Sequence, residues 1–146
     1  MRRMLATIVV IVVVAVGPDR STRLVAECIT DGEVPKKRLG LYPLVFVADV
    51  LNLEKASQPE STNYRVRFRV IEGFRGIDVG ERVLEFQQTA ESFSFAASQR
   101  VLVYASGTRD QYSTQCTATR VVAAEDREVQ ELRRLSRKAA DTPRAR

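Results

Sequence analysis

The stretch Asn63-Tyr-Arg-Val-Arg-Phe-Arg-Val-Ile-Glu72 decides the fold class of this 146-residue chain. Its apolar side chains fall on every second position: Tyr64, Val66, Phe68 and Val70. Because successive side chains of a β-strand point to opposite faces, the stretch predicts a strand with one apolar face and one cationic face. Such a strand covers a core on one side only, which is typical of antiparallel sheets.

Four further segments have the apolar, β-branched composition of short strands: 44–53, 82–86, 100–105 and 115–122. The first contains Asp49, and we expect it to bend or bulge near Ala48. Segment 100–105 is apolar on both faces and is expected to be central. Residues 54–63 are polar and predict a long hairpin loop, while residues 31–38, with a glycine and a proline, predict another loop.

Residues 124–138 predict an amphipathic helix, because Val129, Leu132 and Leu135 recur at helical spacing. Acidic side chains gather at its start and basic ones at its end, which suits the helix dipole. Five short strands, one long polar hairpin and one helix predict an all-β protein: a five-stranded OB-type Greek-key barrel with a C-terminal amphipathic helix. A β-sandwich of this size would need about seven strands.

The composition narrows the function. The chain has a formal charge of +5 with dispersed acidic residues, so it is mildly basic and lacks the polycationic arm of many nucleic-acid binders. It contains no histidine, which excludes a Ser-His-Asp triad, a Cys-His dyad and a histidine metal site. We therefore expect a non-catalytic protein without a cofactor or bound metal.

The N-terminus predicts export. Arg2 and Arg3 precede an unbroken apolar run, 5–16, which has the length of a signal-peptide core and is too short to cross a bilayer comfortably. Cleavage could follow Gly17 or Ala26, so residues 1–26 are assigned to the signal and leader. We expect the folded domain to span 27–138 and a loose tail to span 139–146, in a secreted or periplasmic protein without a stable membrane span after processing.

The chain has two cysteines, Cys28 and Cys116. In an exported protein an even pair favours a disulfide over two buried thiols, although both interpretations fit the residues. A disulfide here would close a loop of roughly 90 residues, worth about 4 kcal/mol in the chain-entropy view.

Several motifs resemble the bacterial relatives of the tissue inhibitors of metalloproteinases, the netrin-like OB-fold family. They are Val45-Phe46-Val47-Ala48-Asp49-Val50, the Tyr64–Val70 strand followed by Gly73, Val101-Leu102-Val103-Tyr104-Ala105, and Ser113-Thr114-Gln115-Cys116 with the helix from Ala124. The resemblance covers roughly residues 45–135 and implies the same barrel. Its Leu-Val-Tyr-Ala and Ser-Thr-x-Cys pieces are the most specific.

Departures from the family pattern bear on activity. Glu91 stands where the family has a middle cysteine, and only Cys28 remains of an N-terminal Cys-x-Cys. If Ala26 replaces the first of these, one family disulfide is missing as a unit and the resemblance implies that Cys28 pairs with Cys116. Inhibition in the animal family requires a cysteine at the mature N-terminus, and no plausible cleavage leaves Cys28 there.

We therefore expect an exported, non-catalytic binding or inhibitor-like module whose partner is a protein or a polyanionic ligand outside the cytoplasm, with no nucleic acid. An alternative is oligosaccharide or other polyanion binding through a cationic patch, which would comprise Arg65, Arg67, Arg69, Arg75 and Arg82, with residues 36–38 extending it. A solvated strand face balanced by nearby acids would explain the same arginines. An enzyme using carboxylates alone has Asp49, Glu54, Glu72 and Glu91 available, but no motif pairs them.

Overall fold

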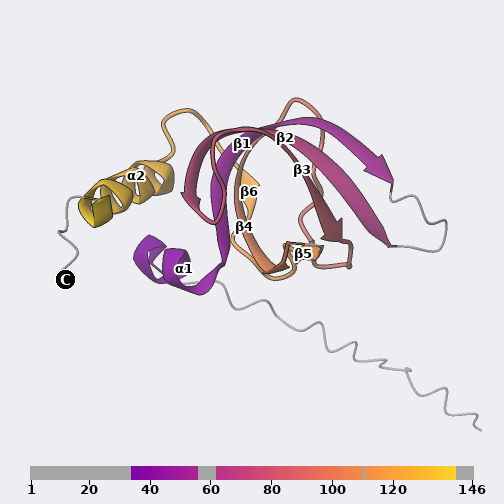
Figure 1. The fold of residues 1–146 in the computed structure, drawn as a ribbon, viewed down its shortest axis with the longest axis horizontal. Coiled ribbons are helices and arrows are strands. Elements are labelled where there is room, and N and C mark those ends of the chain that lie inside the picture. Colours follow the sequence, from indigo (N-terminus) through magenta and orange to yellow (C-terminus); the bar gives the residue numbers. More distant parts are fainter. Residues whose placement is uncertain (1–33, 56–61, 110, 141–146) are drawn as a thin grey trace, which may run out of the picture.

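The computed structural model describes residues 34–55, 62–109 and 111–140 (Figure 1). Its elements in chain order are α1 (Pro35–Leu41), β1 (Leu44–Lys55), β2 (Asn63–Arg75), β3 (Gly80–Gln87), β4 (Arg100–Thr108), β5 (Gln111–Ser113), β6 (Arg120–Val121) and α2 (Arg127–Ala140). Each expected strand is found within a few residues of its predicted place, except the last.

The strands close into an OB-type barrel. Their order is β1-β2-β3-β5-β4, and β1 pairs with β4 to complete the ring. All of these pairings are antiparallel except the short contact between β3 and β5, where Phe86 lies opposite Tyr112. Strand β6 adds two residues outside this ring, alongside β4.

Strand β1 belongs to two parts of the barrel because it bends. Its first half, Leu44 to Asp49, pairs with β4, and nearly its whole length pairs with β2. The pairing with β2 shifts register at three points, including one between Val47 and Ala48 and one after Val50. The bulge predicted near Ala48 is confirmed, and it gives the strand the curvature that barrel closure requires.

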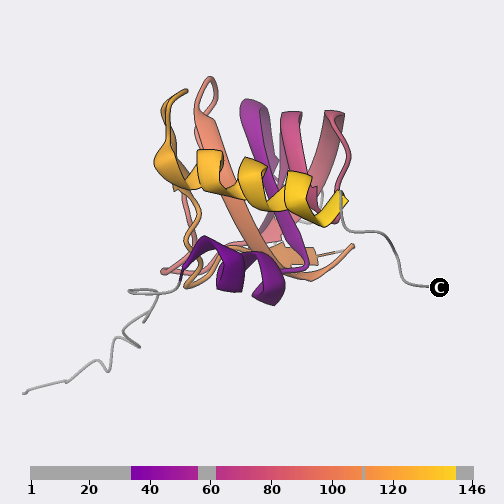
Figure 2. The ribbon, with the colours of Figure 1, turned by 90° about the vertical axis from the view of Figure 1, so that its left-hand side faces the viewer.

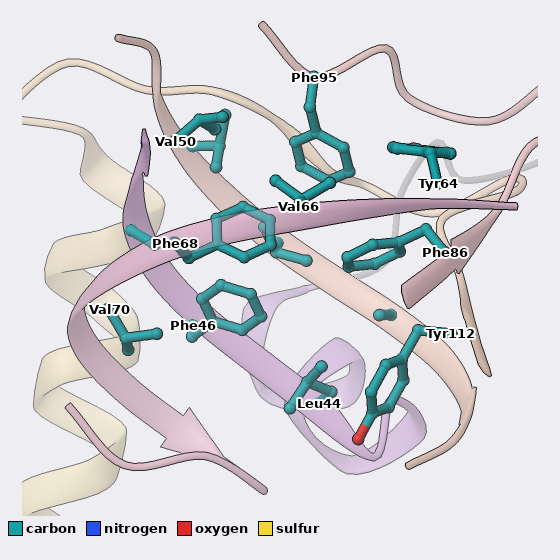
Figure 3. Packing of buried hydrophobic residues seen from close by; sticks show 14 residues of the cluster. Leu44, Phe46, Val50, Tyr64, Val66, Phe68, Val70, Phe86, Phe95 and Tyr112 are labelled. Atoms are coloured by element: carbon teal, nitrogen blue, oxygen red, sulfur yellow. The ribbon is translucent and has the colours of Figure 1, made fainter. Parts of the chain in front are cut away.

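The barrel interior is filled by alternate side chains from every strand of the ring (Figure 3). On β2 the four predicted positions are buried, with Val66 and Phe68 fully enclosed, while the arginines between them are exposed. Phe68 meets Phe46, Phe86 and Phe95 in edge-to-face contacts with ring centroids 5.3–6.0 Å apart. The register predicted from the alternation is therefore confirmed.

A second apolar layer covers the outside of β1 and β4. Val45, Val47, Leu102 and Tyr104 point away from the barrel interior and pack against α2 through its buried Val129 and Leu132. Figure 2 shows α2 crossing in front of the strands with α1 below it. This layer explains why β4 is apolar on both faces.

The loop prediction for residues 31–38 is wrong where the structure describes it, because Pro35 begins α1. Proline favours the first helical position, where its missing N–H costs nothing. The helix buries no residue completely, but Leu39 packs into the second apolar layer and Arg38 pairs with Glu128 on α2. A helix of seven residues depends on such tertiary contacts for its stability, and local sequence does not reveal them.

The predicted last strand, 115–122, is also wrong in its bounds. Only the two-residue strand β6 lies within this range, because β5 ends at Ser113 and β6 begins at Arg120. Between them the Thr117 hydroxyl donates to the Thr114 carbonyl at 3.1 Å and shares a 2.8 Å hydrogen bond with Thr119. Such local side-chain bonds favour a turn over a continuous strand. Strands β4 and β5 pair as a hairpin, with Gly107 opposite Tyr112.

Several predictions lie outside the described residues: the export signal at 1–26, Cys28, and the end of the tail at 141–146. Cys116 lies in the turn between β5 and β6, partly buried, with a φ of 54°. Its pairing with Cys28 stays a prediction. The helix α2 continues to Ala140, two residues beyond its predicted end, so the first two residues of the expected loose tail are helical.

Candidate functional site

The predicted cationic face exists on the outer side of β2. Arg65 and Arg69 lie opposite Glu85 and Glu81 of β3, with nitrogen–oxygen separations of 3.6 Å and 3.8 Å. Arg67 lies opposite Val83 and makes no ion pair or hydrogen bond within the described part of the chain. Arg67 is thus the one arginine of this row whose guanidinium group has no such partner there.

Acidic side chains flank the arginine row on both neighbouring strands. On β1, Glu54 lies opposite Arg65 and Asp49 lies opposite Arg69. On β3, Glu85 and Glu81 occupy the corresponding positions. Four carboxylates around three arginines neutralise the potential of this surface, so the row is an alternating charge lattice more than a cationic strip.

The other two predicted arginines lie elsewhere. Arg75, at the end of β2, donates to the carbonyls of Leu39 and Gly40 at 2.8 and 2.7 Å and so closes the C-terminus of α1. Arg82 donates to the carbonyls of Val79 and Glu81. It lies on β3 opposite Phe68, and therefore on the other face of the sheet from Arg65, Arg67 and Arg69. The structure therefore brings together only Arg65, Arg67 and Arg69.

Two of the four carboxylates that an enzyme could use, Asp49 and Glu72, are bound by arginines. The Arg100 guanidinium donates to both oxygens of Asp49, at 2.8 and 3.1 Å, and lowers the pKa of Asp49. Arg133 of α2 donates to Glu72 at 2.7 Å and lowers the pKa of that carboxyl in the same way. Both groups are stabilised as carboxylates, which is the opposite of what a general acid requires.

Glu54 and Glu91 have only weaker polar contacts. The Asn52 amide lies 3.4 Å from Glu54, and the Gln115 amide lies 3.5 Å from Glu91. Glu91 lies on the connection between β3 and β4, is exposed, and shares no hydrogen-bond partner with Glu54 among the described residues. The four acids are thus distributed over separate places, each with a different partner.

Glu128 is the centre of a polar network that fixes α2 to the barrel. Its Oε1 accepts from the Tyr104 hydroxyl at 2.8 Å and from Arg38 at 2.7 Å, and its Oε2 accepts from Arg120 at 3.0 Å. Burial opposes the charge of Glu128, but these three donors outweigh it and lower its pKa. Asp126 caps the helix by accepting from the backbone N–H groups of Glu128 and Val129.

An apolar hollow at the rim of the barrel was not anticipated. It has a volume of about 340 Å³ and lies between the end of β1, the start of β2 and the β3–β4 connection. Its lining consists of Leu53, Glu54, Lys55, Tyr64, Gln88, Ser94 and Phe95. We call it the rim hollow.

The walls of the rim hollow are well anchored. The Tyr64 hydroxyl donates to the Phe93 carbonyl at 3.3 Å, and burial raises the pKa of Tyr64 to about 12, so it stays neutral. The Phe93 N–H donates to the Thr114 hydroxyl at 3.1 Å. At the end of the connection, Ser98 and Val50 are tied by a 2.8 Å backbone hydrogen bond. A preformed apolar hollow of this kind can receive an apolar side chain of a partner.

The sequence offered one signal for this site. Phe93 and Phe95 lie two apart within a segment rich in serine, alanine and glutamine, where large apolar residues need a reason. Phe95 belongs to the core and borders the hollow, and the ring centroids of Phe93 and Phe95 are 4.9 Å apart. What the sequence could not show is that Leu53 and Lys55, forty residues earlier, form the opposite wall.

No protein-family model matches the chain, and comparison with curated proteins finds no significant similarity. Within the described ranges, no three potential metal-ligating side chains cluster together. In that same part of the chain, neither helix has the length and apolar character needed to cross a bilayer.

Proposed function

We propose that this protein is an exported, non-catalytic binding module that contacts a protein partner through the rim hollow. The observation that carries the proposal is the hollow itself: Leu53 of β1, Tyr64 of β2 and Phe95 of the β3–β4 connection present apolar surface at the rim of the barrel. Lys55 and Glu54 stand at its edge as polar groups able to orient a partner. Binding residues are commonly placed on loops that a rigid scaffold positions.

The charged groups support a binding role over a catalytic one. The carboxylates Asp49, Glu72, Asp126 and Glu128 all have lowered pKa values because arginine side chains or other donors bind them. Catalytic acids instead need a carboxyl that holds its proton near neutral pH. These side chains stabilise the fold and its helix.

The resemblance to the netrin-like family supports the same class, without metalloproteinase inhibition. Glu91 replaces the cysteine that would brace the inhibitory edge, and its side chain is exposed. We expect no inhibition of zinc metalloproteinases at micromolar protein. Potent inhibition would contradict a non-inhibitory N-terminus.

A site-specific photocrosslinking experiment tests the rim hollow. A photoreactive residue at Ser94 should form one defined adduct with an extracellular protein, and the same residue at the exposed Val83 should not. Unlabelled wild type should compete for the adduct, whereas Leu53→Glu should fail to compete. Val83→Glu is the matched control and should compete normally. Equal adducts from both positions, or competition by Leu53→Glu, would refute the site.

Polyanion binding by the β2 face is the second candidate, favoured by Arg67, which has no ion pair or hydrogen bond to the described residues. Heparin binding would have to weaken steeply with salt and disappear when Arg65, Arg67 and Arg69 are all changed to Gln. Because surrounding acids balance the row, we rank this function below binding at the rim hollow. Salt-independent heparin binding would exclude the arginine row.

A further inference from the structure

A second groove lies between the C-terminal half of α2 and the end of β2, on the helix-covered side of the barrel. It has a volume of about 480 Å³. Apolar side chains of Ile71, Phe74 and Val79 line one part of it, and Val79 is 62% exposed. Exposed apolar side chains beside a groove indicate a surface that a ligand can cover.

The other wall of this groove is cationic. Arg133 and Arg137 line it, and both also line a neighbouring hollow with Gln130 and Arg134. Arg133 is occupied by Glu72, whereas Arg137 is exposed and makes no ion pair or hydrogen bond within the described residues. Two arginines and one glutamate leave a net positive charge in the lining.

The groove also contains an unsatisfied polar group. Among the described side chains, Ser136 Oγ is enclosed and has no hydrogen-bond partner. Buried hydroxyls are nearly always paired in folded proteins, so Ser136 is an exception among the described side chains. Ser136 borders the groove beside Arg137.

We propose that this groove binds a small anionic amphiphile, with a carboxylate or phosphate monoester head at Arg137 and an apolar chain against Phe74 and Val79. Charge complementarity places the head at the Arg137 guanidinium group, which makes no hydrogen bond to the described residues and can donate two to a carboxylate or phosphate. The exposed Val79 and the ring of Phe74 provide the apolar surface for the chain. This site is separate from the rim hollow, and the inference does not rest on the function proposed there.

Isothermal titration calorimetry of three ligands with the full mature protein tests which chemical groups the groove binds. Monomeric decanoate has both head and chain, decanol lacks the charge, and inorganic phosphate lacks the chain. Decanoate should bind at least tenfold more tightly than either of the other probes. About tenfold in Kd is what the loss of one charge-assisted hydrogen bond is expected to cost. Equal binding of phosphate and decanoate would overturn the amphiphile.

Variants locate the site. Arg137→Gln should weaken decanoate binding by about tenfold or more, and Val79→Ser should weaken it without affecting the fold, since Val79 is exposed. Arg127→Gln removes the same charge from the other end of α2 and should leave binding unchanged. Loss of binding in Arg127→Gln, or full binding in Arg137→Gln, would overturn the proposal. Binding to phosphatidylglycerol vesicles without binding of monomeric decanoate would also overturn it, in favour of a membrane surface.

Discussion

Replacing Phe68 by alanine tests the barrel core most sharply. Phe68 is fully buried at the centre of the interior and contacts three other aromatic rings at centroid distances of 5.3–6.0 Å. Truncating a buried phenylalanine costs about 3–5 kcal/mol, because apolar contacts are lost and a cavity remains. Each lost edge-to-face aromatic pair adds about 0.5–1.5 kcal/mol beyond area burial, so we expect a value in the upper part of the range.

Arg67→Ala is the matched control, since it changes the adjacent position on the opposite face of β2. Arg67 has no ion pair or hydrogen bond within the described residues, so its loss should change the free energy of unfolding by less than about 0.5 kcal/mol. Urea unfolding followed by far-ultraviolet circular dichroism measures both values. If the two variants exchanged magnitudes, the register of β2 would be wrong, because a one-residue slip reverses both faces.

Three further changes test other parts of the structure. The pKa of Glu128 is lowered from its ordinary 4.5 in the folded protein, so its contribution to stability is present above that value and is lost as pH falls through the folded pKa. Glu128→Gln should therefore flatten the acid limb of a curve of stability against pH, and an unchanged limb would contradict the network around Glu128. Ser136→Ala should leave stability equal or raise it by up to about 1 kcal/mol in urea unfolding, since it removes an unsatisfied hydroxyl and improves helix propensity; a clear loss would show that the hydroxyl is bonded. Gly107→Ala should lower the melting temperature at a cost of about 1–3 kcal/mol, because φ is +102° and a Cβ would lie 2.4 Å from the Gln111 carbonyl oxygen; a neutral result would refute the hairpin geometry.

The fold was accessible from the sequence because alternation on β2 and helical spacing on α2 are strong local patterns. Tyr64 to Val70 alternates without interruption, and Val129 and Leu132 are the buried residues of the helix. The helix α1 and the turn at Thr114–Thr119 were missed for the opposite reason. Arg38 needs Glu128, ninety residues away, and the threonine turn depends on hydroxyl contacts that no periodicity reveals.

Site prediction reached less far. The arginines of β2 were placed correctly on one face, but their acidic neighbours on β1 and β3 follow from strand pairing, which the sequence does not specify. Arg75 was predicted to belong to the same patch, but it lies at the far end of β2 and caps α1. The rim hollow and the groove between α2 and β2 each join segments far apart in the chain, so neither can be recognised from local sequence.

The intact mass of the protein recovered from outside the cytoplasm, measured without reduction, tests the central claim of an exported binding module most directly. We predict a chain that begins within residues 18–27, after the apolar run, and whose mass is lower by two hydrogens because Cys28 and Cys116 are joined. Retention of Met1 in a protein that stays inside the cell would contradict export. A mature chain beginning at Cys28 would contradict the assignment of a non-inhibitory N-terminus.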